Sequence, residues 1–259
     1  MNEVLKTINL NYRDFRNINL VFNRGKFYIV IGSSNCGKTT LFKLLASLIP
    51  TDNMIYCNNI LLTEDNYYEY LVNMGIVERV NSYSFVYKKV IDEMMYPLYN
   101  LGYSKKNILN RINELLSFFD IDYFIDKNIN ELSYLDKQKL LIIISLLHKP
   151  SVLLLDSVLE IFPKNDSFIK KLKKLVKNGL TVISFTKKLE LEVDKIILLD
   201  NYSVLGEYLP SKVYEDDKLF YSHNIEIPFI TDLSIKLKMY DLLDKEYTDM
   251  KEMVDKIWP

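Results

Sequence analysis

Residues 31–40 read IGSSNCGKTT and carry the spacing G-x-x-x-x-G-K-T, which is typical of loops that bind nucleotide phosphates. Gly32 and Gly37 let the backbone curl so that successive N–H groups face an anion. Lys38 would reach the β- and γ-phosphates, and the Thr39 hydroxyl would hold Mg²⁺. The residues expected to contact the nucleotide here are Gly32, Ser33, Ser34, Asn35, Cys36, Gly37, Lys38, Thr39 and Thr40.

The segments on either side of this loop have the patterns that the motif requires. A β-branched run at 26–31 predicts a strand before it, and an apolar-periodic run at 39–49 predicts a helix after it. A strand followed by the loop and then a helix places the helix N-terminus against the phosphates. A chance match at the start of a helix is the alternative, and the flanks disfavour it.

A second segment, VLLLDSVLE at 152–160, predicts a buried parallel strand that ends in Asp156. Ligands of open α/β sheets bind at the carboxyl ends of strands, so Asp156 and Thr39 are the expected metal ligands. The alternative is a strand that ends in a surface aspartate. In many nucleotide hydrolases a second acid follows the first, whereas Ser157 stands here.

Composition excludes several classes of function. The chain has 259 residues, of which 49% are hydrophobic, and a net charge of −1 with mixed signs, so we expect no nucleic-acid partner. The lysines at 170–179 are expected to form the wet face of an amphipathic helix, with membrane or RNA binding as the weaker alternative. Cys36 and Cys57 are expected to form no disulfide. No apolar run approaches the roughly 20 residues that span a bilayer, so a soluble, cytosolic protein is expected.

The order of the remaining elements narrows the class of nucleotide-binding protein. We expect a strand near 72–78, helices near 87–100 and 104–119, and a helix from Ser133 that runs directly into the strand ending at Asp156. Lys38 and Asp156 lie 118 positions apart, which leaves room for a helical insertion. This order is the arrangement of ABC ATPases.

The chain resembles the ATPase subunits of energy-coupling-factor (ECF) transporters nearly end to end, in segments 10–50, 74–104, 181–208 and 207–238. The resemblance implies an α/β P-loop NTPase fold of ABC ATPase type with a RecA-like core. It implies an ATPase domain at 1–209, with a helical subdomain at about 86–150, and a C-terminal extension at 210–259. It further implies ATP and Mg²⁺ as ligands and Tyr12 as the ring that stacks on adenine.

The same resemblance implies that the chain works at the cytoplasmic face of a membrane, with a second ATPase subunit and a transmembrane T component. Contact with the T component would involve the Q-loop and residues 82–95. Helical stripes at 228–243 and 248–258 are more often core than binding surface, but the resemblance favours a dimer contact. His148 and His223 are expected to be structural or surface residues.

Several positions depart from the family pattern. The Q-loop glutamine falls on Arg79, the catalytic glutamate on Ser157, the D-loop aspartate on Pro163 and the switch histidine on Lys187. The signature falls on Leu132, Ser133, Tyr134, Leu135 and Asp136, where two glycines are replaced by bulky residues. Ser133 with Asp136 also resembles a helix-capping pair, which is the plainer interpretation of this segment.

These departures predict a subunit that holds ATP rather than cleaving it. Serine cannot take a proton from water at neutral pH, and a general base contributes typically ~10²–10⁴-fold in rate. Glu160 is expected to lie away from the site because the strand has turned, while Arg79 and Lys187 would favour a bound γ-phosphate. Two other hypotheses stay open: a slow but genuine ATPase, and a free-standing regulatory protein. The imported substrate cannot be read from this chain.

Overall fold

The computed structural model describes residues 2–51, 54–80, 85–189 and 192–257. The strands are β1 (Glu3–Tyr12), β2 (Phe15–Asn23), β3 (Phe27–Ile31), β4 (Ile55–Cys57), β5 (Ile60–Leu61), β6 (Met74–Val77), β7 (Val152–Asp156), β8 (Thr181–Thr186), β9 (Lys195–Asp200) and β10 (Ser203–Tyr208). The helices are α1 (Lys38–Leu45), α2 (Tyr67–Val72), α3 (Val90–Asn100), α4 (Lys105–Phe119), α5 (Tyr134–Leu146), α6 (Ser167–Lys177), α7 (Lys212–Glu215), α8 (Asp217–Ser222), α9 (Phe229–Met239) and α10 (Met250–Ile257). Short 3₁₀ turns are η1 (Asp122–Phe124), η2 (Ile129–Glu131) and η3 (Leu159–Ile161).

The central sheet has the order β10-β9-β3-β8-β7-β6, and all neighbours in it are parallel except the hairpin β9–β10. Its strands are apolar on both faces because both faces are covered. In β3, Tyr28 and Val30 point into the core against β1, β2 and α1, whereas Ile29 and Ile31 point into the core under α7 and α8. The predicted buried strands at 26–31 and 152–156 are confirmed, and β7 runs parallel to both its neighbours.

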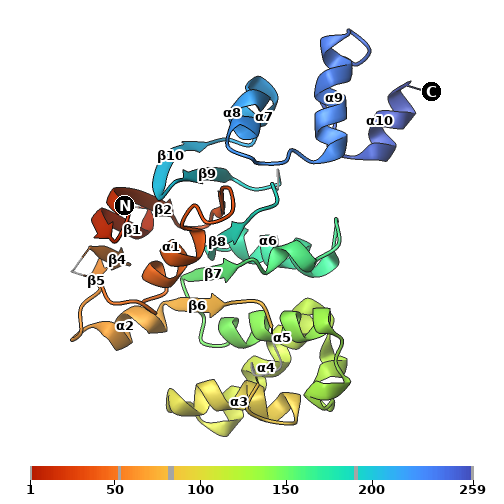
Figure 1. Ribbon diagram of the computed structural model, residues 1–259. Coiled ribbons are helices and arrows are strands. Elements are labelled where there is room, and N and C mark those ends of the chain that lie inside the picture. The colour runs from red at the N-terminus through yellow and green to blue at the C-terminus, as the bar shows by residue number, and fades with distance from the viewer. Residues whose placement is uncertain (1, 52–53, 81–84, 190–191, 258–259) are drawn as a thin grey trace.

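A second, antiparallel sheet has the order β2-β1-β4-β5 and lies beside the central sheet, with α1 between the two (Figure 1). The helix predicted at 39–49 ends early, at Leu45. Ser47 has a φ of 56°, and the Leu48 N–H donates to the Lys43 carbonyl, so the chain leaves the helical direction there. Left-handed backbone of this kind commonly ends helices.

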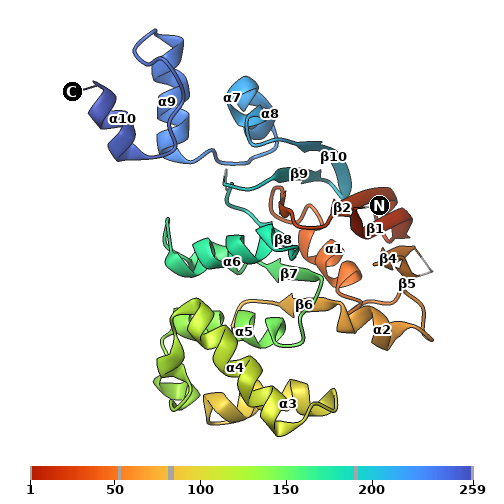
Figure 2. The ribbon, with the colours of Figure 1, turned by 180° about the vertical axis from the view of Figure 1, so that it is seen from behind.

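Helices α3, α4 and α5 form a separate layer beyond β6, on the side of the molecule opposite α7–α10 (Figures 1 and 2). The predicted helices near 87–100 and 104–119 are α3 and α4. The helix predicted from Ser133 is α5, and the Ser133 hydroxyl caps it by accepting the Asp136 N–H at 3.1 Å. This layer and α6 share one apolar core that reaches the central sheet at Leu153, Leu155 and Val182.

The C-terminal fifty residues pack in two parts. Residues 213–227 lie on the central sheet, where Val213 and Phe220 join its core. Helices α9 and α10 form a small cluster of their own around Leu243, Tyr247 and Met253. The surface that these two helices leave exposed includes Phe229, Met239, Tyr240, Leu242, Met250 and Val254.

Other side chains singled out in the sequence have structural surroundings. Cys36 and Cys57 are both free thiols and both buried. His148 Nε2 lies 3.0 Å from the Met74 carbonyl oxygen, and burial lowers the pKa of its ring. His223 Nδ1 lies 2.8 Å from the Leu219 carbonyl oxygen within its own turn. None of the helices among the described residues is long and apolar enough to cross a bilayer.

Candidate nucleotide site

The phosphate loop joins the end of β3 to the start of α1, and the two glycines in it have no room for a side chain. A Cβ on Gly32 would overlap the Leu199 carbonyl oxygen and would lie 2.6 Å from Cys36 Sγ. Gly37 has a φ of +104°, and a Cβ there would lie 2.6 Å from the Phe15 ring. Both positions therefore require glycine for the loop to keep this path.

Lys38 folds over the loop that precedes it. Its Nζ donates to the carbonyl oxygens of Gly32 and Ser33, each at 2.6 Å, and only 8% of the residue is exposed. No side chain caps the N-terminus of α1, and its first turn carries no acid. The ammonium group and the free N–H groups of the first turn make this end of the helix suited to an anion.

Thr39 and Asp156, the two predicted metal ligands, lie together. Asp156 ends β7, and its carboxylate accepts a hydrogen bond from the Thr39 side chain across the intervening strand β8. Burial raises the pKa of Asp156, while the hydrogen bonds from Ser157 and Thr39 act in the opposite direction. A hydroxyl and a carboxylate in contact are an oxygen donor pair of the kind that Mg²⁺ takes, so the residues fit that ion.

Ser157 is turned toward Asp156 and is held by its backbone. Its φ is 56°, its N–H donates to the Phe185 carbonyl at 2.8 Å, and its hydroxyl lies 3.3 Å from Asp156 Oδ1. Left-handed backbone at a non-glycine residue carries strain and is common at functional sites. The hydroxyl can hydrogen-bond a water molecule but cannot accept its proton at neutral pH.

Glu160 lies at the edge of the site, and the expectation from the sequence that it lies away from the site is wrong. The left-handed turn at Ser157 and the 3₁₀ turn η3 bring the chain back over the ends of β7 and β8. The Glu160 carboxylate accepts the Lys187 N–H at 2.9 Å and forms an ion pair with Arg79. It also raises the pKa of Asp156 by its charge, so it lies at the same edge of the sheet.

Arg79 and Lys187, the two cations predicted near the phosphates, lie on either side of Glu160. The Arg79 Nε–H donates to the Ser157 carbonyl at 2.7 Å, in addition to the ion pair with Glu160. Lys187 contributes its backbone N–H to Glu160, and its own side chain is exposed. Positions 79, 157, 160 and 187 therefore form one connected group beside Asp156.

Gln138 is a buried residue behind Arg79 that the motifs did not indicate. It is fully buried in α5, and its side-chain oxygen accepts the Val80 N–H at 2.8 Å. Its side-chain nitrogen donates to the Glu78 carbonyl at 3.1 Å. The backbone on both sides of Arg79 is thus fixed by one amide. The sequence did contain an indication of this role, since Gln138 begins the apolar run QKLLIIISLL. An amide in a buried segment needs hydrogen-bond partners.

The aromatic residues near the loop include two that the sequence did not indicate. Phe15 and Tyr202 form an edge-to-face pair with centroids 5.4 Å apart, and both would meet a Cβ on Gly37. The Tyr202 N–H also donates to the Cys36 carbonyl at 3.0 Å. Tyr12, the predicted adenine platform, lies opposite Phe15 in the β1–β2 ladder, with the Arg13 guanidinium 5.3 Å from its ring centroid.

The signature-like residues stand in the helical layer, at the start of α5. Tyr134 is exposed, Leu135 is half-buried, and Leu132 is buried in the core of that layer. Both interpretations of the segment are compatible with this arrangement, since the cap at Ser133 is real and the bulk of Tyr134 faces outward. The predicted contact segment 82–95 begins with residues 82–84, which lie outside the described residues.

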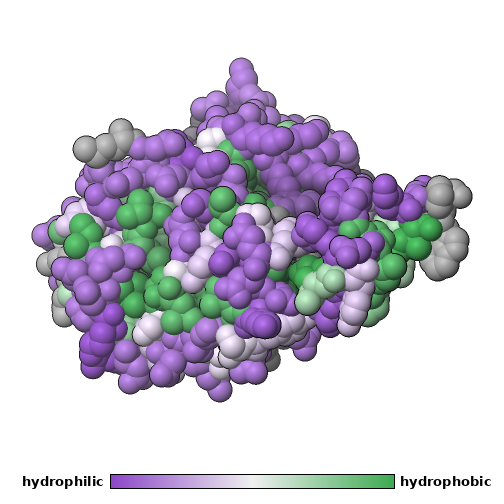
Figure 3. Space-filling model, turned by 90° about the horizontal axis from the view of Figure 1, so that it is seen from above, coloured by the Kyte–Doolittle hydropathy of each residue, from purple (hydrophilic) through white to green (hydrophobic). Residues whose placement is uncertain are grey.

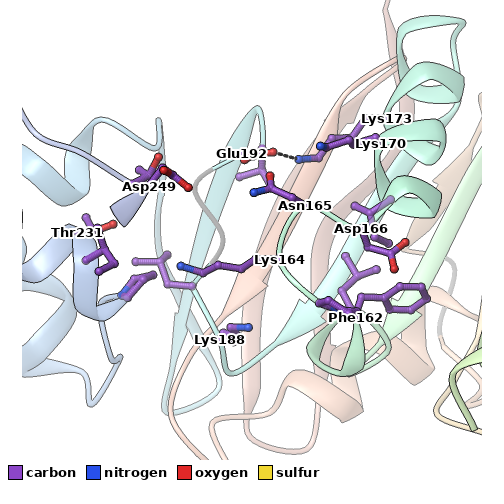
Figure 4. A pocket seen from close by; sticks show the side chains of 18 of the residues that line it. Phe162, Lys164, Asn165, Asp166, Lys170, Lys173, Lys188, Glu192, Thr231 and Asp249 are labelled. Atoms are coloured by element: carbon purple, nitrogen blue, oxygen red, sulfur yellow. Dashed lines mark hydrogen bonds and ion pairs between the residues drawn. The ribbon is translucent and has the colours of Figure 1, made fainter. Parts of the chain in front are cut away.

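A cavity of about 410 Å³ lies between the segment containing Pro163, helix α6 and the C-terminal helices (Figure 4). Lysines line it, and Lys173 forms an ion pair of 2.6 Å with Glu192. Other acids of its wall already cap helices: Asp166 accepts the Phe168 N–H, and Asp249 accepts the Lys251 N–H. The phosphate loop takes no part in this cavity.

Comparison with known proteins agrees with this geometry. The profile of the ABC transporter family matches residues 15–160, which is more than half of the chain. The energy-coupling factor transporter ATP-binding protein EcfA1 of Oenococcus oeni is 28% identical, over 99% of this chain and 98% of that protein. EcfA1 of Mesomycoplasma hyopneumoniae strain J is 26% identical, over 97% and 93% respectively.

Among solved structures, cbiO1 from Clostridium perfringens, described as part of the ABC transporter complex cbiONQ, superposes with a TM-score of 0.75. It is 21% identical, and the match covers 90% of this chain and 99% of that one. At that identity the likeness concerns the fold alone, which confirms the expected α/β P-loop architecture of ABC type. From its phosphate loop to its last helices, the chain is similar to ATP-binding subunits of energy-coupling-factor transporters, and it belongs to the ABC transporter family.

Proposed function

We propose that this chain is a nucleotide-binding subunit of an ECF-type importer that binds Mg·ATP and hydrolyses it poorly or not at all. The observation that carries the proposal is the contrast within one site. Lys38 and Thr39 lie beside Asp156, and these three residues would hold a nucleotide and its metal. The position beside Asp156, where the family has its glutamate, carries the Ser157 hydroxyl.

Each retained group has a part in binding. Loop N–H groups and Lys38 would hold the phosphates, and Tyr12 would stack on the base. Thr39 and Asp156 would hold Mg²⁺, which when bound would neutralise part of the phosphate charge. Because Lys38 already donates to two loop carbonyls, nucleotide binding exchanges these bonds for bonds to phosphate oxygens. The ammonium group is therefore held at the loop before the nucleotide arrives.

The replaced groups shift the balance toward retention. The Arg79 guanidinium bonds the residue that follows Asp156 and pairs with Glu160, and its remaining N–H donors would favour a bound γ-phosphate over the products of its loss. The exposed side chain of Lys187, whose backbone N–H donates to Glu160, would add to this preference. Neither group is a base at neutral pH. We infer a site that keeps ATP bound and leaves the attacking water without a proton acceptor at position 157.

A subunit that retains ATP without hydrolysing it can work in a dimer whose other subunit hydrolyses ATP. A homodimer would have two impaired sites, so we propose a heterodimer with a more complete ATPase, together with a transmembrane T component, at the cytoplasmic face of the membrane. The relatives support this, since they are named as transporter subunits and cbiO1 is part of a complex. Hydrophobic residues also gather at the end of the molecule where the C-terminal helices lie (Figure 3), and these residues would serve as a dimer contact.

A slow but genuine ATPase is the second candidate, and one observation favours it. The Glu160 carboxylate lies at the edge of the sheet where a base would act. Its oxygens are already engaged by Arg79, by the Lys187 N–H and by the Thr186 hydroxyl at 3.2 Å. A carboxylate with these partners is less available to accept a proton, so we rank this function second.

Steady-state turnover tests the proposal. Phosphate release by the purified chain with Mg·ATP should not exceed that of Lys38→Ala, while the wild-type chain still binds ATP and the variant does not. Turnover at the ordinary rate of an ABC ATPase, about 1 s⁻¹ or above, that Lys38→Ala abolishes would refute the proposal. The same assay with the partner present would then locate catalysis in one subunit or the other.

A further inference from the structure

We propose that Glu160 is a positioning residue that holds Arg79 at the phosphate edge and thereby sets the preference of this site for ATP over ADP. The inference rests on the proposed function, in that it takes the site to be a nucleotide holder. It deepens that function by assigning a role to a carboxylate that the motif positions do not include.

Two contacts hold the Arg79 side chain, and one buried amide holds the backbone on either side of it. The Nε–H donates to the Ser157 carbonyl at 2.7 Å, and a second nitrogen of the guanidinium pairs with Glu160. Behind it, the amide of Gln138 binds the backbone of residues 78 and 80. An arginine side chain has many rotamers, and fixing it beforehand removes an ordering cost from the binding step.

Glu160 is the more deeply placed partner. Its side chain is 18% exposed, against 45% for Arg79. A carboxylate at that depth, next to the charge of Asp156, is destabilised unless a cation neutralises it. The Lys187 N–H and the Thr186 hydroxyl hold one of its oxygens, so the other oxygen faces Arg79. The carboxylate is therefore a fixed anchor rather than a mobile surface acid.

The guanidinium of Arg79, held by Glu160, keeps N–H donors that can bind a further group. The group has five N–H donors, of which the two described contacts use two. The others can donate to an oxyanion, in the fork geometry that suits phosphate. Arg79 bonds the residue next to Asp156, so it lies on the metal side of the site. The terminal phosphate is what ATP has and ADP lacks, so a cation fixed there discriminates between them.

The experiment measures dissociation constants of the full chain for AMP-PNP and for ADP, both with Mg²⁺, by calorimetry. Arg79→Gln should weaken AMP-PNP binding about tenfold, the lower end of a charge-assisted contact because the group is half exposed, and ADP binding less than about twofold. Glu160→Gln should lose most of the same preference. The double variant should be no worse than Arg79→Gln alone, since both act through one contact. Glu192→Gln, which breaks the ion pair with Lys173, should change neither constant.

Three results would overturn the inference. Equal losses for both nucleotides would mean that Glu160 only supports the fold. Additive losses in the double variant would mean that the two residues act separately. Hydrolysis in the wild type that Glu160→Gln abolishes, with AMP-PNP affinity kept, would make Glu160 a base. AMP-PNP resists hydrolysis, so this experiment is independent of the test of the proposed function. A chain that retains intact ATP can lack the binding preference, and a chain that hydrolyses ATP can still show it.

Discussion

Gln138→Met removes the amide that fixes the Q-loop while keeping the length and bulk of the side chain. Gln138 is fully buried and makes one hydrogen bond to the Val80 N–H and one to the Glu78 carbonyl. A methionine can replace neither bond. The substitution therefore separates the polar role of this side chain from its packing, because no cavity is left behind.

The cost follows from the two backbone groups left unpaired. A buried donor or acceptor without a partner costs roughly 1–3 kcal/mol. Val80 is 5% exposed, so its N–H bears a cost near the middle of that range, about 2 kcal/mol. Glu78 is an exposed residue whose carbonyl can reach water, so it adds about 1 kcal/mol. The expected loss in free energy of unfolding is about 3 kcal/mol.

Urea denaturation of the full chain measures this loss, as a midpoint about 1 M lower with an unchanged slope. Lys137→Met introduces the same residue one position earlier on the half-buried face of α5, and should change stability by about 0.5 kcal/mol or less. Arg79 lies between the two released backbone groups, so Gln138→Met should also reduce the preference for AMP-PNP over ADP. A midpoint shift no larger than that of Lys137→Met would refute the assigned role.

The remaining predictions concern the loop, the metal ligand and the C-terminal helices. Gly32→Ala, whose Cβ would meet the Leu199 carbonyl, should weaken ATP binding at least tenfold in a titration. Gly102→Ala, whose Cβ would meet open space but whose φ is +77°, should cost stability and leave binding unchanged. Asp156→Asn should abolish Mg²⁺-dependent ATP binding yet raise Tm at pH 7. Burial raises the pKa of Asp156 above its ordinary value of 3.8. The free energy of unfolding of the wild-type chain therefore falls as the pH rises from 3.8 through the raised pKa, and the asparagine variant avoids this loss. The gain in Tm should vanish below the ordinary aspartate pKa of 3.8, and a gain that persists there would contradict the assignment to charge. Truncation after residue 228 should abolish association with the partner ATPase in size-exclusion chromatography while ATP binding persists, and association that survives would exclude the last two helices as the contact.

The parts of the site that sequence could predict are those whose chemistry fixes local spacing. The glycines of the loop, Lys38 and Thr39 form a contiguous motif, and Asp156 ends an unmistakable buried strand. Parallel pairing then brings these residues to one edge, as expected. The Ser133 cap was also predictable, because capping is a local hydrogen bond.

Glu160 and Gln138 could not be placed in the same way. The position of Glu160 depends on a left-handed residue at Ser157, which no residue preference indicates for a serine. The role of Gln138 depends on a contact 58 positions away in the chain. The C-terminal extension shows the same limit. The sequence predicts its boundary at 210, whereas residues 213–227 pack on the central sheet. This packing makes residue 228 a better point for truncation.

The nucleotide that stays bound tests the central claim most directly. The purified chain, without its partner, would be incubated with Mg·ATP for hours, separated from free nucleotide and denatured, and the released nucleotide identified by chromatography. Lys38→Ala would be the control for binding at the phosphate loop. The account predicts intact ATP on the wild-type chain and almost no nucleotide on the variant. Bound ADP that accumulates over the incubation and requires Lys38 would contradict it.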